Sequence, residues 1–387
     1  MDGWTELEHG RNSMFPTISI AGAPFERGKQ YGRQAAAQIR HSIASYARMF
    51  AFYGLDWAEV QRRAEPFAPV IAAFDAGLLE EIQGIAEGAG RAPTEILALN
   101  ARTELLPPSL AVASPAWEQA AAHNRIAGVP EHGECTAVAV LPAASADGTT
   151  RLAQTWDWTG DQRAACVLLR VESPGSPALL TLTEAGILAK IGLNAAGLGV
   201  CLNILRTPLD GQRPGVPVHV LLRALLGEPD VAAALRRTKG LAVGGSSNLL
   251  CADVSGRVAS LELTPAAQAV LEPSDGLLIH TNHCVAPETS RVAGTLDTLL
   301  TSQPRYSRAE QLLRPQAGSI DRAALVALLR DEAPGPEAIC RRPDPSLPPP
   351  ARVETVAAVV MELAERTIYL APDIPADVAF TPVHLEG

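Results

Sequence analysis

The sequence is poor in aromatic and in basic residues, and both shortages limit the partners that the chain can bind. Aromatic residues make up 4% of the 387 residues, and Lys plus Arg total 32 against 42 Asp plus Glu, which gives a formal net charge of −10. A protein that binds nucleic acid carries the opposite charge balance, and a stacking platform needs aromatic side chains among basic ones. We therefore expect no nucleic-acid partner.

Long apolar runs and clustered cysteines are also missing. No run approaches the roughly 20 residues that cross a bilayer, and residues 1–9 lack the basic and apolar regions of a secretory signal. The six cysteines form no CxxC pair: Cys135, Cys166, Cys201, Cys251, Cys284 and Cys340. We expect a cytoplasmic protein without a membrane partner, with reduced thiols instead of a disulfide scaffold or a zinc ribbon.

The composition predicts a large buried core. Hydrophobic residues make up 47% of the chain and charged residues 19%, which excludes wholesale disorder. The length suits one large domain or two ordinary ones.

The first hundred residues carry helical patterns. Glu26–Phe52 and Trp57–Gly90 place apolar or small residues at helical spacing, and Thr94–Leu106 is expected to form a third helix with Thr94 as its N-cap. The segment 107–133, with its prolines and glycines, is expected to be a loop or linker.

Short strands are expected from Thr136 onward, because apolar or alternating runs are bounded by Asp-Gly, Pro-Gly and Ala-Gly turn signals. The expected strands are 136–141, 165–171, 178–183, 197–203, 247–253, 258–263, 276–280, 355–363 and 367–370. The expected helices among them are 218–226, 230–239, 307–313 and 320–331. Blocks of helices that alternate with blocks of strands predict a layered α+β fold.

Cys135 is the strongest candidate nucleophile, because it stands where the loop-like segment meets the first apolar strand. A lone cysteine at such a position is more often a small core residue. If the bond before Cys135 were cut, however, its new α-amine would have a pKa near 7.7–8.0 and could act as a general base on its own thiol. One residue would then supply both nucleophile and base.

Several short sequence motifs resemble those of a known family and occur in the same order along the chain. They are Ala23–Gly28, Glu81–Ala89, Leu99–Glu104, Cys135-Thr136, Gln154–Trp158, Thr183–Ile187, Gly192–Leu198, His280–His283 and Ala338–Arg341. With these phrases the chain resembles, almost end to end, the acyl-CoA:isopenicillin N (6-aminopenicillanic acid) acyltransferase family, the C45 peptidase family of N-terminal nucleophile (Ntn) hydrolases.

The resemblance implies a four-layer αββα sandwich that is made as a precursor. Self-cleavage between Glu134 and Cys135 would give a helical propeptide or α chain, 1–134, and a catalytic β chain, 135–387. The two chains are expected to remain associated, because the helical block has apolar faces that separation would expose. The implied chemistry is amide hydrolysis or acyl transfer through a thioester on Cys135.

The resemblance also implies roles for two residues. Asp157, in Trp-Asp-Trp, matches the active-site aspartate that orients the α-amine, with a turn-capping Asp as the alternative. Asn282, in His-Thr-Asn-His, matches the asparagine whose amide donates to the tetrahedral oxyanion. Its alternative is a turn asparagine.

Three further residues match less closely. Asn194, in Gly-Leu-Asn, resembles a second oxyanion-side asparagine, although a turn asparagine suits the pattern nearly as well. Arg352 and Arg305 resemble active-site arginines that pair with Asp157 or hold a substrate carboxylate, and a solvated surface charge is the alternative for each. The chain departs from the family at Glu134, where glycine precedes the nucleophile in the fungal member.

Other function classes fit less well. His280 and His283 are spaced as H-x-x-H beside Cys284, but no HExxH or distal Cys/His pair accompanies them, so we expect no metal. No organic cofactor is implied either, and an acyl-CoA would be a co-substrate if transfer dominates. We expect a substrate that is a small N-acyl amino compound or peptide-like amide. The alternative is a catalytically silent member that serves as a binding or scaffold protein in a biosynthetic complex.

Overall fold

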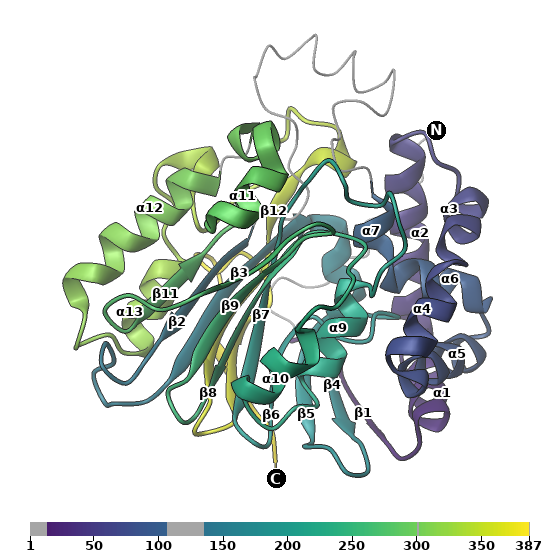
Figure 1. Ribbon diagram of the computed structural model, residues 1–387, viewed down its shortest axis with the longest axis horizontal. Coiled ribbons are helices and arrows are strands. Elements are labelled where there is room, and N and C mark those ends of the chain that lie inside the picture. Colours follow the sequence, from purple (N-terminus) through teal and green to yellow (C-terminus); the bar gives the residue numbers. More distant parts are fainter. Residues whose placement is uncertain (1–13, 107–134, 300–301, 387) are drawn as a thin grey trace.

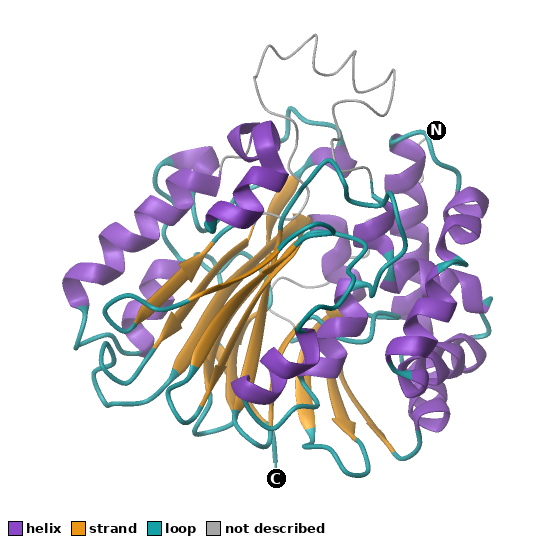
Figure 2. Cartoon of the chain, viewed as in Figure 1, coloured by secondary structure: helices purple, strands orange, loops and turns teal. Residues whose placement is uncertain are grey.

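Two β-sheets lie face to face between two layers of helices (Figures 1 and 2). The computed structural model describes residues 14–106, 135–299 and 302–386, and the statements below concern these residues. The arrangement confirms the expected α+β fold with four αββα layers. No described helix is both long enough and apolar enough to cross a membrane.

The larger sheet has eight strands. In spatial order they are β1 (Thr17–Ala21), β4 (Cys166–Glu172), β5 (Leu179–Glu184), β6 (Ile191–Asn194), β7 (Leu198–Ile204), β8 (Ser247–Asp253), β9 (Val258–Leu263) and β10 (Gln268–Leu271). All neighbours are antiparallel except β1 and β4, which pair in parallel from Thr17 opposite Leu168 to Ala21 opposite Glu172. The N-terminal segment thus contributes an edge strand, which its sequence did not predict.

The smaller sheet has six strands, all antiparallel to their neighbours. In spatial order they are β11 (Leu277–His280), β2 (Cys135–Val140), β3 (Arg151–Thr159), β12 (Val353–Glu362), β13 (Thr367–Ala371) and β14 (Thr381–His384). Strands β2 and β3 pack against β7 of the larger sheet. The start of β2 therefore lies between the two sheets, where its residues are removed from water.

Helices cover the outer face of each sheet. On the side of the larger sheet lie α1 (Pro24–Gln34), α2 (Ala36–Phe52), α3 (Trp57–Ala64), α4 (Phe67–Phe74), α5 (Ala76–Ala89), α6 (Pro93–Asn100), α7 (Arg102–Leu105), α9 (Val218–Leu225) and α10 (Val231–Thr238). Helix α11 (Pro287–Ala293) lies against β10, and α12 (Ser302–Leu313) and α13 (Arg322–Leu329) cover the smaller sheet. One core cluster joins the first helices to both sheets, and a second lies beneath α12 and α13.

The expected helices near the N-terminus are shorter than their patterns suggested. The run Glu26–Phe52 is interrupted at Ala35, and Trp57–Gly90 is divided into three helices by Pro66 and Asp75. Asp75 starts the last of these by accepting hydrogen bonds from two backbone N–H groups. Thr94 is not an N-cap, because its hydroxyl donates to the side chain of Gln61.

Helices α1 and α5 cross so closely that their backbones touch. A Cβ atom on Gly28 would lie 2.0 Å from the carbonyl oxygen of Glu81, and one on Gly84 would lie 2.1 Å from that of Phe25. Both distances are far below any van der Waals contact, so only glycine fits at these positions. The close contact at these glycines therefore fixes how α1 and α5 pack against each other.

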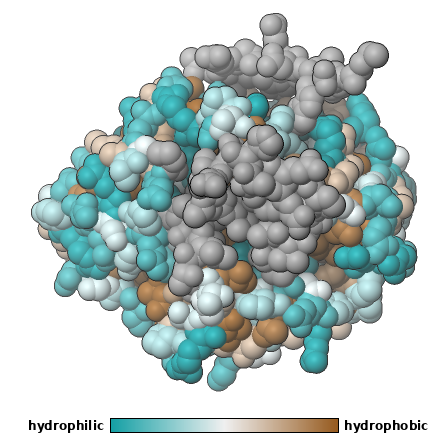
Figure 3. Space-filling model, turned by 90° about the horizontal axis from the view of Figure 1, so that it is seen from above, coloured by the Kyte–Doolittle hydropathy of each residue, from teal (hydrophilic) through white to brown (hydrophobic). Residues whose placement is uncertain are grey.

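The described surface is mostly hydrophilic, and its hydrophobic residues lie in small groups in the view of Figure 3. Among the described residues four large hydrophobic side chains are exposed, and they are scattered in the sequence: Met14, Val254, Val270 and Val285.

Candidate active site

Cys135 is the first residue of β2, and its partner strands place polar groups around it. In the antiparallel register Cys135 lies opposite Trp156 of β3, so that Asp157 follows at the next position. The backbone N–H of Asp157 hydrogen-bonds the thiol. Cys135 is 4% exposed and thus lies within the core between the two sheets.

The backbone of Cys135 is held by side chains from three other segments. Its N–H donates to Oδ1 of Asn282 over 2.6 Å. Its carbonyl oxygen accepts hydrogen bonds from Nη1 of Arg305 (2.9 Å) and from Nδ2 of Asn203 (3.0 Å). These contacts fix both sides of the candidate nucleophile.

The Asn282 amide is oriented by its own contacts. Its Oδ1 also accepts from Nη2 of Arg305 (3.1 Å), while its Nδ2 donates to the carbonyl of Ile204 over 2.8 Å. The oxygen therefore faces the Cys135 nitrogen and the donor faces the end of β7. The expected role of Asn282, donation of its amide to a tetrahedral oxyanion, stays a prediction.

Asp157 is fully buried, and its environment favours the neutral form. Its Oδ1 accepts a hydrogen bond from the Thr355 hydroxyl (2.7 Å), whereas Oδ2 has no hydrogen-bond partner among the described residues. Burial raises the pKa of Asp157 to about 7, although the Arg305 charge and hydrogen bonds from Thr355 and Thr155 oppose this rise. The carboxyl can thus hold or release a proton near neutral pH.

The thiol of Cys135 is held in its protonated form. Burial and the nearby Asp157 raise its pKa to about 11, while Lys190 and Arg305 act in the opposite direction. Attack by this sulfur therefore requires a neighbouring group that takes its proton.

A narrow pocket beside Cys135 is lined by two cations and two tryptophans, namely Lys190, Arg102, Trp156 and Trp158. Its water-accessible volume of about 10 Å³ is roughly what one water molecule needs. Nζ of Lys190 lies 3.7 Å from the centre of the Trp156 ring, and burial lowers its pKa to about 8. Lys190 is thus a second group whose proton can be exchanged near neutrality.

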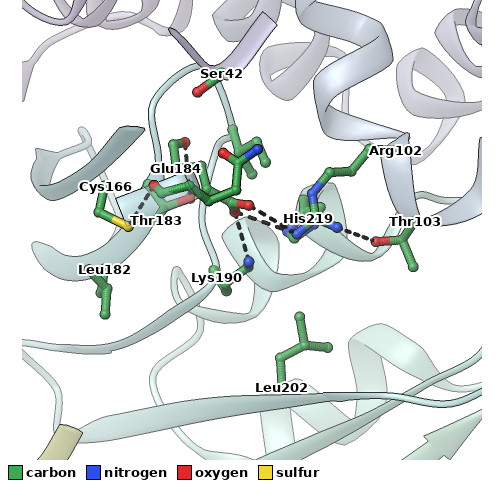
Figure 4. A network of polar contacts seen from close by, with 12 residues as sticks. Ser42, Arg102, Thr103, Cys166, Leu182, Thr183, Glu184, Lys190, Leu202 and His219 are labelled. Carbon is green, nitrogen blue, oxygen red and sulfur yellow. Dashed lines mark hydrogen bonds and ion pairs between the residues drawn. The ribbon is translucent and has the colours of Figure 1, made fainter. Parts of the chain in front are cut away.

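Glu184 compensates these cations from the end of β5 (Figure 4). Its carboxylate lies 2.7 Å from Nζ of Lys190 and 3.3 Å from Nη2 of Arg102, and it accepts a hydrogen bond from the Tyr46 hydroxyl at 2.5 Å. Burial alone would raise the pKa of Glu184, but Arg102 and Lys190 hold it below its ordinary value. Because Tyr46 and Arg102 belong to α2 and α7, the helical layer reaches into the site.

The structure brings together Cys135, Asp157, Asn282 and Arg305, and it places two other candidates elsewhere. Asn194 stabilises the β6–β7 turn: its Oδ1 accepts from the N–H groups of Ala196 and Leu198, and its Nδ2 donates to two carbonyls near the end of α9.

Arg352 binds the carbonyl oxygens of Pro345 and Leu347 in the proline-rich loop. Arg305 is fully buried, so that the alternative of a solvated charge does not apply to it. The expected cleavage-site residue Glu134 lies outside the described residues.

Two residues of the site, Asn203 and Lys190, were not identified as candidates from the sequence. Asn203 ends a hydrophobic strand pattern, and Lys190 stands alone in an apolar stretch, so neither carried a motif of its own. Only the packing of β7 against β2 shows that the Asn203 amide meets the carbonyl of Cys135.

The paired histidines have partners of their own. Nε2 of His280 lies 2.8 Å from Oε1 of Glu262, and Nδ1 of His283 lies 2.6 Å from the Ser302 hydroxyl. In the described ranges no three His, Cys, Asp or Glu residues are arranged to hold a metal ion.

A family model described as acyl-coenzyme A:6-aminopenicillanic acid acyl-transferase matches residues 144–377, which is more than half of the chain. The chain belongs to this family. Asp157, Asn282 and Arg305 lie inside the matched range, and Cys135 lies nine residues before it. Membership of the acyl-transferase family places the chain among enzymes of acyl transfer.

Individual proteins resemble the chain to different degrees. The acyl-coenzyme A:6-aminopenicillanic-acid-acyltransferase 40 kDa form of Emericella nidulans is 28% identical over 327 residues, or 84% of each chain. Penicillin V acylase from Agrobacterium tumefaciens superposes with a TM-score of 0.41 and 15% identity, over 62% of this chain and 83% of that one. A mutant of conjugated bile acid hydrolase from Clostridium perfringens gives a TM-score of 0.40 and 14% identity, over 62% and 89%.

Proposed function

We propose that the chain is an Ntn-type cysteine acyltransferase or amidohydrolase that cuts itself before Cys135. The mature enzyme would act on a small N-acyl amino compound through a thioester on this residue. The observation that carries the proposal is the position of Cys135 at the start of β2, where its N–H and carbonyl are bound by Asn282, Arg305 and Asn203 and its thiol meets Asp157.

Self-cleavage needs a base other than an α-amine, because that amine does not yet exist. In the proposed step the Cys135 sulfur attacks the carbonyl carbon of residue 134 and its proton leaves to a neighbouring group. The C–N bond breaks as the Cys135 nitrogen gains a proton, which leaves a thioester. Water then hydrolyses the thioester, releasing a carboxylate at residue 134 and regenerating the thiol. Asp157 is the candidate proton carrier, since its pKa of about 7 allows both forms at neutral pH.

Turnover would use the new α-amine of Cys135. An α-amine with a pKa near 7.7–8.0 takes the thiol proton, the sulfur attacks the substrate amide, and the amine leaving group receives that proton. Oδ1 of Asn282, which binds the Cys135 N–H in the uncut chain, would then accept from the amine and keep it beside the sulfur. Water or an acceptor amine completes the reaction, so hydrolysis and transfer share the thioester.

The proposed α chain, 1–134, and β chain, 135–387, would stay together. Strand β1 is hydrogen-bonded to β4, and the Tyr46 and Arg102 side chains bind Glu184. The N-terminal helices also share a core with the sheets.

Intact mass under denaturing conditions tests the proposal on the wild type and on Cys135→Ala. We expect two chains for the wild type, the larger beginning at Cys135, and one chain of 387 residues for the variant. The wild type, incubated with N-acyl p-nitroanilides, should then show the mass of the acyl group on the Cys135 peptide. A single uncut chain in both proteins, without acylation, would contradict an Ntn enzyme and favour a binding protein.

A further inference from the structure

A β-bulge in the smaller sheet lies directly across from Asp157. In the antiparallel register of β12 and β3, Thr355 is paired with Asp157 and Ala357 with Trp156, so that Val356 is an extra residue on β12. Directly opposite residues of antiparallel strands project from the same face of the sheet. Bulges are over-represented beside active sites, where they aim a side chain at a defined point. The bulge therefore singles out Thr355 as a residue that acts on Asp157.

The hydroxyl group of Thr355 is held in one orientation. Its Oγ1 accepts a hydrogen bond from the Arg341 N–H over 2.8 Å and donates to Oδ1 of Asp157 over 2.7 Å. The Thr355 N–H also donates to the Arg341 carbonyl over 3.0 Å, so the two residues are joined at both groups. A hydroxyl group has one proton to donate, and an N–H group can only donate. The proton of the Thr355 hydroxyl is therefore directed to Asp157.

The backbone of the bulge is fixed by Arg163. Its guanidinium donates from Nη2 to the Thr355 carbonyl over 3.1 Å and from Nε to the Val356 carbonyl over 3.4 Å. The same guanidinium pairs with Glu354 at 2.8 Å and with Asp373 at 3.0 Å. Thr355 is fully buried, so that water does not compete for its hydroxyl group. The contact with Asp157 is thus built into the fold of the smaller sheet.

The second oxygen of Asp157 has a different environment. Oδ2 is buried and has no hydrogen-bond partner among the described residues. The other side chains that act on this carboxyl group or feel its charge are those of Arg305, Thr155, Cys135 and Cys340. Burial outweighs the Arg305 charge and the two threonine hydroxyls, and it raises the pKa of Asp157 to about 7. A proton that Asp157 takes up near neutral pH therefore binds to Oδ2, since Oδ1 already accepts from Thr355.

We propose that Thr355 is a positioning residue of the active site: it occupies Oδ1 of Asp157, so that Oδ2 is the atom that exchanges a proton with Cys135. This inference rests on the proposed function. In self-cleavage the Cys135 sulfur gives its proton to Oδ2 of the Asp157 carboxylate as the bond from sulfur to the carbonyl carbon of residue 134 forms. The same proton moves from Oδ2 to the Cys135 nitrogen as the carbon–nitrogen bond breaks. The motif Ala338–Arg341 has a function on this basis, because its last N–H group orients the Thr355 hydroxyl.

Titration of Asp157 in the uncut Cys135→Ala protein tests the inference without cleavage or turnover. The carboxyl carbon-13 NMR signal of Asp157, assigned by its absence from Asp157→Asn, would be followed from pH 4 to 9. A hydrogen bond from a hydroxyl group favours the carboxylate over the neutral acid. Thr355→Val should therefore move the midpoint of the titration upward by about one pH unit, and Thr355→Ser should keep it near that of the parent protein.

Thr367→Val is the matched control. Thr367 is also fully buried in the smaller sheet, but its hydroxyl group contacts Nδ1 of His384 at 2.7 Å and the carbonyl of Glu365 at 3.0 Å. This variant should lose stability while the midpoint of Asp157 stays in place. An unchanged or lower midpoint in Thr355→Val, or an equal shift in the Thr367 variant, would overturn the proposal.

A second measurement needs no change at Thr355. Because the Arg341 N–H, the Thr355 hydroxyl and the Asp157 carboxyl form one chain of hydrogen bonds, the amide NMR signal of Arg341 should shift with pH at the midpoint of Asp157. Asp157→Asn should abolish this shift. An Arg341 amide that does not respond to the titration would contradict the orientation of the hydroxyl and overturn the proposal.

The rate of self-cleavage in the chain that retains Cys135 gives the functional readout. Thr355→Val should slow cleavage about tenfold at pH values below the midpoint of Asp157, leave the rate at high pH nearly unchanged, and be rescued by Thr355→Ser. An equal loss of rate at every pH would mean a structural role alone and would overturn the proposal. Failure of the proposed function would look different: the wild type would not cut itself at any pH, while Thr355→Val would still move the midpoint of Asp157.

Discussion

Oδ1 of Asn282 lies 2.6 Å from the backbone nitrogen of Cys135, the atom that would become the α-amine after cleavage. The same oxygen accepts from Arg305, so a guanidinium and a backbone amide meet at one acceptor. This places the Asn282 side chain on the nitrogen side of the bond that we propose is cut. Its first effect would be to position the leaving nitrogen.

Asn282→Ala should slow turnover by roughly 10²–10³, the usual cost of removing one donor to a tetrahedral oxyanion. It should also slow self-cleavage, because the Cys135 nitrogen loses the acceptor that positions it. Intact mass over time measures the cleavage. Asn194→Ala is the control, because Asn194 makes four hydrogen bonds in the β6–β7 turn and none to Cys135. It should lower the unfolding temperature while the cleavage rate of the folded protein stays unchanged. Equal rate losses in the two variants would contradict a direct role for Asn282.

Asp157→Asn should change how stability depends on pH. In the folded chain burial raises the pKa of Asp157 from 3.8 to about 7, so the unfolded chain releases this proton at lower pH. The protonated Asp157 therefore contributes to the free energy of unfolding below about pH 4. This contribution, on the order of 4 kcal/mol, is lost as the pH rises from 4 to 7. Denaturant unfolding from pH 4 to 8 would show this slope in the wild type but not in Asp157→Asn. Parallel curves would mean that the carboxyl is ionised throughout.

Lys190→Met should make Cys135 less reactive. The ammonium group favours the thiolate of Cys135, so its loss should raise the pKa of the thiol further and slow alkylation at pH 8 several-fold. Peptide mass spectrometry after iodoacetamide treatment would follow Cys135 alone. Lys29→Met is the matched control, because Lys29 pairs with Glu87 between α1 and α5. Unchanged labelling in Lys190→Met would show that this cation does not act on the sulfur.

Gly84→Ala should destabilise the chain although alanine favours helices. A new Cβ would lie 2.1 Å from the Phe25 carbonyl oxygen, and overpacking of this kind costs about 1–3 kcal/mol or more against a gain of about 1 kcal/mol in helix propensity. Gly77→Ala, in the same helix, meets only side-chain atoms at 3.2 Å or beyond. Its unfolding free energy should change little. Similar values for both variants would contradict the close crossing of α1 and α5.

Much of the fold could be predicted, because in many segments the hydrophobic pattern of the sequence matches the burial of the residues in the structure. The strands β8 and β9 were expected within their observed bounds, since their residues alternate or are uniformly apolar between clear turns. Strand β3 was not expected, because Gln154, Asp157 and two tryptophans do not form an apolar run. All nine of its residues are nevertheless buried, since β2 and β12 lie on either side of it.

Only those residues of the site that lie within recognisable sequence motifs could be predicted. The Trp-Asp-Trp and His-Thr-Asn-His phrases indicated Asp157 and Asn282, and the structure places both beside Cys135. Asn194 was expected near the nucleophile and Asn203 was not, whereas the structure places Asn203 there, because that end of the β6–β7 hairpin faces the smaller sheet. No local pattern contains that information, because it is set by how the two sheets stack.

The parallel pairing of β1 with β4 has a consequence for any attempt to produce residues 135–387 alone. A chain that starts at Cys135 lacks the strand that covers β4, and the backbone groups of β4 along Leu168 to Glu172 would become a free sheet edge. Such edges recruit strands from other molecules. Residues 135–387 expressed alone should therefore form insoluble aggregates, and co-expression with residues 1–134 should restore soluble protein. On this prediction the N-terminal segment would protect the edge of the larger sheet while the chain folds.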